Sequence, residues 1–231
     1  MWGLSCAKLL WMPALFLATG NAHKIAEVRS ILGPEFLFLS QRDTSVRFDV
    51  PETADTFEGN AALKALAWAA YLRTDTCNLG AEWVLADDSG LEVDALDGAP
   101  GIHSARYAGL DTGTPGNSAD AANNAKLLRM LIDVPDAQRT ARFRCVLALI
   151  PVATPRPDAV RHFSGACPGR IQREAGGVGG FGYDPLFVPD GYLHSFAELG
   201  AEVKNQLSHR AQALAQLKDW FRTDASVGST Q

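Results

Sequence analysis

A short apolar run that leads through a tight turn into a helix constrains the fold of this chain more than any other feature. Residues 14–18 read Ala-Leu-Phe-Leu-Ala, which has the length and composition of a strand buried on both faces. Thr19-Gly20-Asn21 follows, and Asn21 is a natural N-cap for a helix that stops at Gly33-Pro34. A strand, a turn and a helix in succession favour an α/β fold.

The rest of the pattern predicts a sheet that is mixed rather than purely parallel. Val84-Leu85-Ala86 is expected to be a strand that stops at the turn Asp87-Asp88-Ser89-Gly90. Phe143 to Ile150 and Val160 to Ser164 are expected to be paired strands. Helices are expected at about residues 60–73, from a cap at Ser118 to about Ile132, and from Ser208 onward with Leu214, Leu217 and Phe221 inward.

Composition and charge limit the possible partners. With 231 residues, 47% of them hydrophobic, the chain can bury the core of one large domain or of two lobes that share a cleft. The net charge of −5 argues against binding to a nucleic acid polymer, whereas a small anionic ligand needs only a few local cations. The four cysteines lie far apart without zinc-site spacing, so reduced thiols in a cytoplasmic protein are expected.

The apolar N-terminal segment, residues 1–17, invites comparison with a signal peptide. It is too short to span a membrane, and it runs directly into the strand and turn described above, which cleavage would disrupt. No membrane association is therefore expected. We hypothesise that Met12 is the natural start and that residues 1–11 are a disordered or non-native extension. A single domain is expected at 12–223, followed by a frayed tail at 224–231.

Two adjacent carboxylates, Asp87 and Asp88, follow the apolar strand. Acidic groups that lose hydration side by side need a cation, or one of them must hold a proton. Mg²⁺ suits such a site because it takes hard oxygen ligands and bridges carboxylates to phosphates. One carboxylate could hold the metal while the other withdraws a proton from an attacking water. Gly90 would let the chain turn away. The alternative is a solvent-facing turn that the two residues merely cap.

The turn that opens the first helix, Thr19 to Lys24, is a candidate anion site. Backbone N–H groups and the positive end of the helix dipole face an anion at such a turn, and Lys24 adds a full charge. The P-loop spacing is absent, and many turns of this kind bind nothing.

A cationic segment, Lys204-Asn205-Gln206-Leu207-Ser208-His209-Arg210, is expected just ahead of and into the last helix. Cations are unfavourable at a helix N-terminus, so an external anion such as a phosphate, or a polar base edge, would explain them. The alternative is that His209 and Arg210 are solvated surface residues.

Glycines surround an aromatic residue between Gly176 and Gly182, where five of seven residues are glycine. The backbone must bend sharply or approach another group there. Phe181 could stack on a flat ring while the carboxylate of Asp184 reads its hydrogen-bonding edge. A turn in the core with buried rings is the alternative.

Five segments together resemble the inosine triphosphate pyrophosphatase family, the dITP/XTP pyrophosphatases that clear deaminated purine nucleotides. The resemblance runs from about Leu17 to Leu214, nearly the whole chain. Its segments occur in the family's order, and the acidic block and the GFGYDP block are together highly specific. They read LATGNAHKIAEV, TFEGNAALKA, ADDSGLEVDALDGAPGIHSARYAG, GFGYDPLF and KNQLSHR.

The resemblance implies roles for individual residues. Asp88 would be the proton acceptor and a metal ligand, and Asp87 beside it and Glu52 would be further metal ligands; Glu58 is the nearby competitor for the place of Glu52. Ser89 would contact the nucleotide, and Lys64 would assist with phosphate. The phosphate turn would comprise Thr19, Gly20, Asn21, Ala22, His23 and Lys24, with no base-reading role for His23. The base and sugar would be surrounded by Phe181, Gly182, Tyr183, Asp184, Lys204, His209 and Arg210.

The resemblance also implies an architecture and a reaction. Two α/β lobes would surround a long mixed sheet with flanking helices, the active site would lie in the cleft between them, and a homodimer would be the assembly. The reaction would be Mg²⁺-dependent hydrolysis of ITP, dITP or XTP to the monophosphate and pyrophosphate. The alternatives are a related pyrophosphatase for modified pyrimidine nucleotides or dUTP, and a non-catalytic nucleotide sensor.

Overall fold

The computed structural model describes residues 12–74 and 79–223. Within these residues the chain forms one six-stranded sheet with the strand order β2-β1-β3-β4-β5-β6. The predictions for residues 1–11 and 224–231 lie outside the described residues. No helix in the described ranges is long and apolar enough to cross a membrane.

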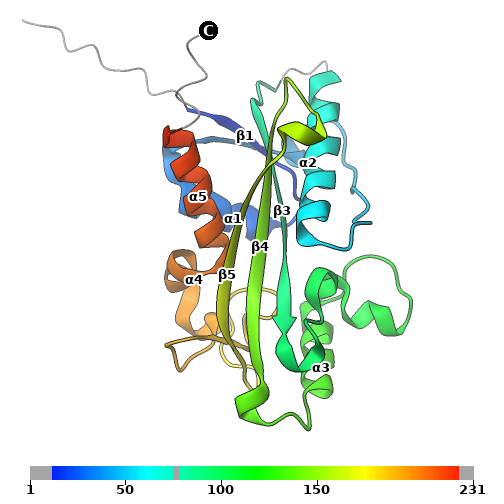
Figure 1. Cartoon of the computed structure of the whole chain (residues 1–231), viewed down its shortest axis with the longest axis vertical. Helices are drawn as coiled ribbons and strands as arrows, with labels where there is room; N and C mark the ends of the chain where they lie inside the picture. The colour runs from blue at the N-terminus through cyan, green and yellow to red at the C-terminus, as the bar shows by residue number, and fades with distance from the viewer. Residues whose placement is uncertain (1–11, 75–78, 224–231) are drawn as a thin grey trace, which may run out of the picture.

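The sheet is mixed, as predicted. β1 pairs in parallel with both β2 and β3, whereas β3, β4, β5 and β6 pair with one another in antiparallel order. β3, β4 and β5 are long strands that run side by side through the sheet (Figure 1). The strand bounds are β1 Ala14–Leu17, β2 Leu37–Ser40, β3 Trp83–Val93, β4 Thr140–Pro151, β5 Arg161–Ile171 and β6 Phe187–Pro189.

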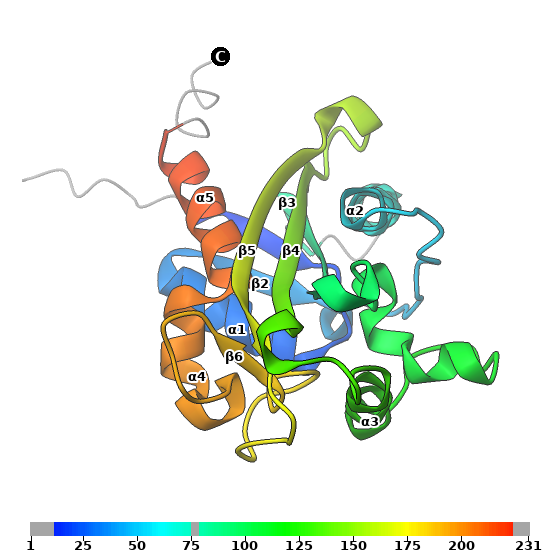
Figure 2. The same cartoon turned by 60° about the horizontal axis from the view of Figure 1, so that its bottom comes forward.

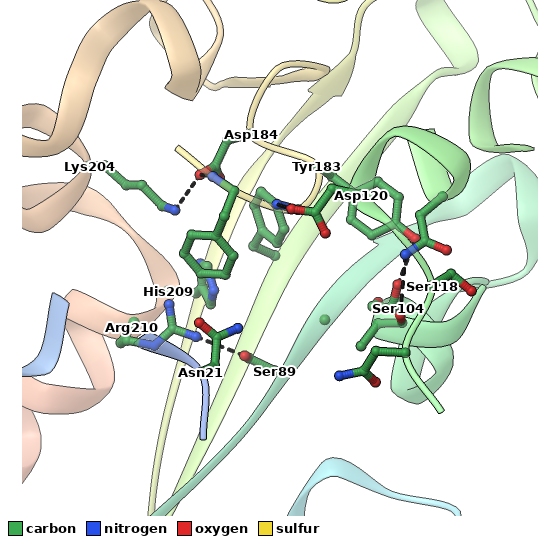
Figure 3. A pocket seen from close by; sticks show the side chains of 17 residues that line it. Asn21, Ser89, Ser104, Ser118, Asp120, Tyr183, Asp184, Lys204, His209 and Arg210 are labelled. Carbon is green, nitrogen blue, oxygen red and sulfur yellow. Dashed lines mark hydrogen bonds and ion pairs between the residues drawn. The ribbon is translucent and has the colours of Figure 1, made fainter. Parts of the chain in front are cut away.

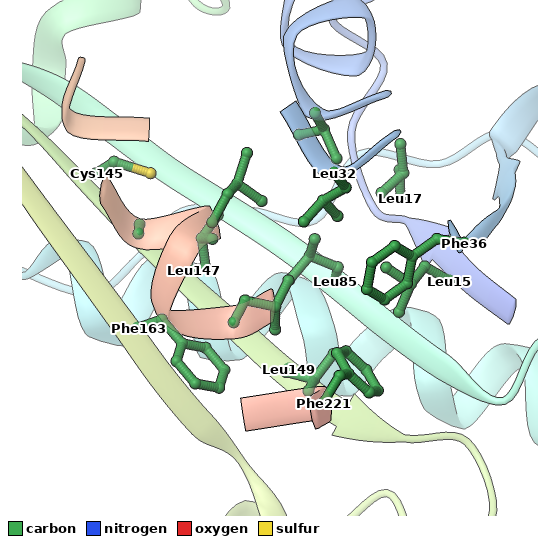
Figure 4. Close-up of a cluster of buried hydrophobic side chains, with 14 residues drawn as sticks. Leu15, Leu17, Leu32, Phe36, Leu85, Cys145, Leu147, Leu149, Phe163 and Phe221 are labelled. Atoms are coloured by element: carbon green, nitrogen blue, oxygen red, sulfur yellow. The ribbon is translucent and has the colours of Figure 1, made fainter. Parts of the chain in front are cut away.

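Helices cover both faces of the sheet, which confirms the α/β fold class. α1 and α5 lie on one face and α2 lies on the other (Figures 1 and 2). Figure 4 shows the apolar cluster under α1 and α5, where Leu85 and Leu147 meet Leu32 and Phe221. The helix bounds are α1 Ala22–Leu32, α2 Phe57–Thr74, α3 Asp120–Met130, α4 Phe196–Leu207 and α5 His209–Thr223.

Of the helix caps that the sequence predicts at Asn21 and Ser118, one is correct. Asn21 caps α1 as predicted, because its side chain accepts hydrogen bonds from the backbone of His23 and Lys24. The prediction that Ser118 caps α3 is wrong: the helix begins at Asp120, and the Ser118 hydroxyl instead accepts a hydrogen bond from the Gly109 backbone.

The last part of the chain forms two helices where the sequence predicted one. Lys204 lies in the last turn of α4 rather than ahead of a helix. Ser208 separates α4 from α5, and its hydroxyl accepts a hydrogen bond from the backbone of Ala211. The inward residues of the last helix are buried as predicted: Leu214, Leu217 and Phe221.

The predicted acidic turn is also wrong, because Asp87 to Gly90 lie in the middle of β3. Antiparallel pairing with β4 continues through these residues, with Asp88 opposite Val146. What ends near this point is the neighbouring strand β1, whose last partner on β3 is Leu85. Past Leu85, β3 is no longer paired to β1 along one edge. Polar side chains can therefore line a site there while the strand itself continues.

Gly90 does not turn the chain, but close packing explains its lack of a side chain. A Cβ atom there would lie 2.4 Å from the carbonyl oxygen of Gly101 and 2.5 Å from Oγ of Ser104. The Ser104 hydroxyl in turn accepts a hydrogen bond from the backbone of Leu91 at 2.9 Å. The segment after β3 is therefore fastened directly over the strand that carries the acidic residues.

Candidate active site

Asp87 and Asp88 project from opposite faces of β3, since successive side chains alternate along a strand. Asp87 faces the side of α1 and α5, where Arg210 of α5 and Lys24 of α1 bond to its carboxylate. Asp88 faces the side of α2, where Lys64 bonds to it. The two carboxylates therefore have different environments although they are adjacent in sequence.

Lys64 links the two acidic side chains on the α2 face. Its Nζ donates to Oδ1 of Asp88 at 2.8 Å and to Oε1 of Glu52 at 2.9 Å. Arg106 Nη1 donates to the other oxygen of Glu52 at 2.7 Å. Oδ2 of Asp88 is buried and has no hydrogen-bond partner among the described residues. An ionised oxygen without a partner is costly when buried, so this atom is suited to receive a proton or a cation.

The pKa values of the two acids move in opposite directions. Burial raises the pKa of Asp88 to about 6, against the opposing effect of Lys64. Burial also acts to raise the pKa of Glu52, but the charges and hydrogen bonds of Lys64 and Arg106 outweigh it and lower this pKa to about 2. Glu52 is thus fixed as an anion, whereas Asp88 exchanges a proton near neutral pH, as a general base must.

Asp87 is surrounded by hydrogen-bond donors on the other face of β3. Lys24 Nζ lies 2.5 Å from its Oδ1, and Arg210 Nε lies 2.8 Å from its Oδ2. The Ser89 hydroxyl donates to Oδ1 at 2.9 Å, and the Cys145 thiol lies 3.3 Å from Oδ2. Burial acts to raise the pKa of Asp87, but Arg210 and Lys24 hold it well below its usual range. Asp87 therefore stays ionised.

Two adjoining hollows open beside these residues. The larger is a cleft of about 750 Å³, and the smaller is a pocket of about 130 Å³, which is drawn in Figure 3. Asn21, Ser89, Ala105 and Asn117 line both hollows, so one ligand could extend from one into the other.

The structure distributes most of the predicted site residues between the two hollows. The larger cleft is lined by Thr19, Gly20, Asn21, Lys24, Glu52, Lys64, Asp87, Asp88 and Ser89. The smaller pocket is lined by Asn21, Ser89, Phe181, Gly182, Tyr183, Asp184, Lys204, His209 and Arg210. Ala22 and His23 line neither one. Glu58 lies away from the acidic group and pairs with Arg144 at 3.6 Å.

Charged and aromatic side chains form the wall of the smaller pocket. Lys204 Nζ lies 2.6 Å from Oδ2 of Asp184 and 4.3 Å from the centroid of the Phe181 ring. Figure 3 shows the contact between Lys204 and Asp184, and the same Asp184 oxygen accepts the Phe181 backbone N–H at 2.8 Å, which fixes the glycine-rich loop. Burial raises the pKa of Asp184, with Lys204 opposing the shift. Protein donors therefore occupy Oδ2 of Asp184.

His209 presents an uncharged ring to the smaller pocket. It stacks on Phe143 with the ring centroids 4.8 Å apart, and its Nδ1 is buried without a hydrogen-bond partner in the part of the chain that the structure describes. Burial and the nearby charges of Arg210 and Lys204 hold its pKa well below the usual range. The neutral imidazole has one N–H donor and one acceptor, which can distinguish hydrogen-bonding edges of a ligand.

The interpretation of His209 and Arg210 as solvated surface residues is wrong. Their exposed fractions are 3% and 1%. Two carboxylates of the protein pair with the charge of Arg210: Asp87 on β3 and Glu27 on α1 both accept hydrogen bonds from it. Glu27 also lies 2.8 Å from Lys204 Nζ.

Sequence reasoning missed several residues of the site, including Glu27, Arg106 and Phe143. Glu27 follows Lys24 by three positions on α1, which places the two on one helical face, so its position was a usable signal. Arg106 lies within the third segment of the resemblance, but neither its own role nor that of Phe143 is marked locally, because their partners are distant in sequence. Within the described ranges, no group of three or more His, Cys, Asp or Glu side chains is arranged to hold a metal ion.

The chain is similar to known proteins over most of its length. A sequence profile described as the Ham1 family matches residues 15–220. A dITP/XTP pyrophosphatase of Porphyromonas gingivalis is 48% identical over 211 residues, covering 91% of this chain and 98% of that protein. The protein of the same name from Opitutus terrae is 45% identical, covering 90% of this chain and 98% of that protein. A HAM1 protein from Coxiella burnetii superposes with a TM-score of 0.74 at 37% identity, covering 91% of this chain and 99% of that one.

Proposed function

The chain belongs to the Ham1 family, and from this premise we propose that it hydrolyses non-standard purine nucleoside triphosphates such as ITP, dITP and XTP. It is a nucleoside-triphosphate pyrophosphatase, and its reaction removes deaminated purines from the nucleotide pool. The observation that carries the proposal is the buried Asp88 carboxylate, with one free oxygen, beside a cleft that contains Lys24 and Lys64 and adjoins an aromatic pocket.

The reaction that fits these groups is attack of water on the α-phosphorus. The α–β phosphoanhydride bond breaks, and the products are the nucleoside monophosphate and pyrophosphate. Asp88 accepts the proton of the attacking water, for which its raised pKa is suitable. Lys24 and Lys64 line the cleft as cations that can hold phosphate oxygens, and backbone N–H groups at the start of α1 add to this binding.

We propose Mg²⁺ as the metal, with Glu52 and Asp88 as the residues that hold it. The residues fit a hard cation, because Oδ2 of Asp88 is a buried carboxylate oxygen with no partner and Glu52 remains ionised. When bound, the cation supplies positive charge that offsets the charge of the phosphates. Lys64 contacts both acids and keeps them close together.

Selectivity for the base is proposed to reside in the smaller pocket. Hypoxanthine and xanthine present a 6-oxo acceptor where adenine presents an amino donor. A donor directed at this position would face another donor in adenine, at a cost of about 1–3 kcal/mol per mismatched contact. The neutral His209, Arg210 and backbone N–H groups are the candidate donors. Rejection of GTP requires recognition of its 2-amino group, for which we assign no residue.

We further propose that the enzyme is a cytoplasmic homodimer that acts on free nucleotides. The net charge of −5 supports a small ligand over a nucleic acid polymer. Sedimentation of the full chain tests the assembly, with a single dimeric species expected.

Pyrophosphate release from a panel of dITP, XTP, ATP, GTP and dUTP, each with and without Mg²⁺, tests the proposed function. Release from dITP and XTP that requires the metal is expected. Preferred hydrolysis of dUTP would instead support a pyrimidine-directed enzyme, and binding of ITP without release of pyrophosphate would support a nucleotide sensor.

A further inference from the structure

The contacts of Asp87 support a role other than the metal binding that the sequence suggested for it. We infer that Asp87 is a positioning residue that ties Lys24 of the phosphate turn to Arg210 of α5, and that it is not a ligand of the metal. This inference rests on the proposed function, because it concerns how the phosphate end and the base end of the nucleotide site are held at a fixed distance from each other.

The first step is the occupancy of the Asp87 oxygens. Oδ1 accepts from Lys24 Nζ at 2.5 Å and from the Ser89 hydroxyl at 2.9 Å, while Arg210 Nη2 lies 3.4 Å away. Oδ2 accepts from Arg210 Nε at 2.8 Å and lies 3.3 Å from the Cys145 thiol. A carboxylate offers about four lone-pair sites, so donors already fill this group.

The second step is the contrast with Asp88. Oδ2 of Asp88 has no partner, and the neighbouring acid on its face is Glu52, which shares Lys64 with it. Strand alternation directs the Asp87 side chain to the opposite face, where its partners in the structure are cations and hydroxyl or thiol donors. A metal there would have to displace two cations from a fully occupied carboxylate.

The third step is what the contacts of Asp87 connect. Lys24 lines the larger cleft, whereas Arg210 lines the smaller pocket. Ser89 also connects Asp87 with Arg210, because its hydroxyl contacts Asp87 and lies 2.8 Å from Arg210 Nη2. One buried carboxylate thus sets the spacing between a phosphate-binding cation and a cation of the base pocket.

The absence of metal ligation is tested in wild-type crystals soaked with Mn²⁺ alone, located by its anomalous scattering. The ion is expected on Asp88 and Glu52, with every Asp87 oxygen beyond coordination distance. An Asp87 oxygen at about 2.2 Å from the ion would overturn the inference. This experiment uses no variant and no turnover. Its outcome is therefore separate from failure of the proposed function, which would appear as a lack of pyrophosphate release.

The coupling is tested by a double-mutant cycle on kcat/KM for dITP with Asp87→Asn and Lys24→Gln. The asparagine keeps the shape of Asp87 but removes its charge, so Lys24 and Arg210 lose their shared anion. If Asp87 acts through Lys24, the double variant is expected to be no more than about threefold worse than the poorer single variant. If the fold losses in kcat/KM of the two single variants multiply in the double variant, the inference is overturned. A second cycle with Arg210→Gln applies the same criterion to the other partner.

Discussion

Lys64 donates a hydrogen bond to one oxygen of Asp88 at 2.8 Å, while the other oxygen of that carboxylate is buried without a partner within residues 12–74 and 79–223. The hydrogen bond fixes the orientation of the side chain, and the free oxygen gives it a group that can react. Asp87, one residue earlier on the same strand, has no such free oxygen. In the proposed mechanism, the opposite faces of β3 thus separate the proton acceptor Asp88 from the positioning residue Asp87.

Replacing Asp88 by asparagine should remove both the proton acceptor and a carboxylate ligand of the proposed metal. We expect kcat for pyrophosphate release from dITP to fall by about 100-fold or more. Steady-state kinetics at saturating Mg²⁺ provide the measurement, with circular dichroism as the check on folding. Near wild-type turnover by the Asp88→Asn protein with metal bound would rule out the assigned role.

The pH dependence of activity should follow the ionisation of Asp88. Burial raises its pKa from the ordinary 3.8 to about 6, and only the ionised form can accept a proton. At low Mg²⁺, kcat/KM is therefore expected to rise with pH through about 6 and then level off. Higher Mg²⁺ should shift this rise to lower pH, because the cation competes with the proton. A midpoint that does not respond to Mg²⁺ would show that another group is titrating.

The same pKa shift predicts an effect on stability in the metal-free protein. A carboxyl whose pKa is raised on folding favours the folded state only while it is protonated, so this contribution is present below pH 3.8 and is lost as the pH rises through about 6. Asp88→Asn removes the buried charge, and Lys64 loses an anionic partner, which offsets part of the gain. We expect the variant to be more stable than wild type by about 1–2 kcal/mol at about pH 8.

Urea unfolding in the presence of a chelator measures this difference. The advantage of the Asp88→Asn protein should shrink as the pH is lowered to about 5, where wild-type Asp88 is largely protonated. A variant that is less stable than wild type at both pH values would mean that the ionised Asp88 stabilises the fold.

Gly165 on β5 allows α5 to pack closely against the sheet. A Cβ atom there would lie 2.1 Å from the carbonyl oxygen of His209 and 2.9 Å from the backbone nitrogen of Ala213. Gly165→Ala must therefore displace the first turn of α5, which carries His209 and Arg210. We expect a loss of about 1–3 kcal/mol in stability and a lower preference for dITP over dATP.

The neighbouring Ser164→Ala substitution is the matched control for this prediction. Ser164 is exposed, since β5 alternates between buried and exposed positions. This change should leave both the unfolding free energy and the nucleotide preference close to wild type. Equal effects of the two substitutions would show that the backbone approach at Gly165 does not position the helix.

The features of the fold that depend on neighbouring residues could be predicted from sequence. The errors arose where contacts with residues far away in the sequence determine the structure. The capping of α1 by Asn21 depends on residues within one helical turn, and this prediction is confirmed. The strand at Asp87 to Gly90 was missed because the site places polar residues where a buried strand would carry apolar ones. Its continuation depends on β4, more than fifty residues later in the chain.

The burial of Arg210 shows the same limit more sharply. A cation at the start of a helix suggests exposure when only the neighbouring residues are considered. In the structure its partners Asp87 and Glu27 come from β3 and α1, which are far away in sequence. The residue types of the site were thus visible in the sequence, but the pairing that separates Asp87 from Asp88 depends on the tertiary structure.

Hydrolysis of dITP in water labelled with heavy oxygen tests the central claim most directly. The wild-type enzyme with Mg²⁺ should release pyrophosphate and place the label in dIMP, because water attacks the α-phosphorus. The products can be separated and weighed by mass spectrometry. Label in the pyrophosphate, or release of orthophosphate in its place, would contradict the reaction assigned to Asp88.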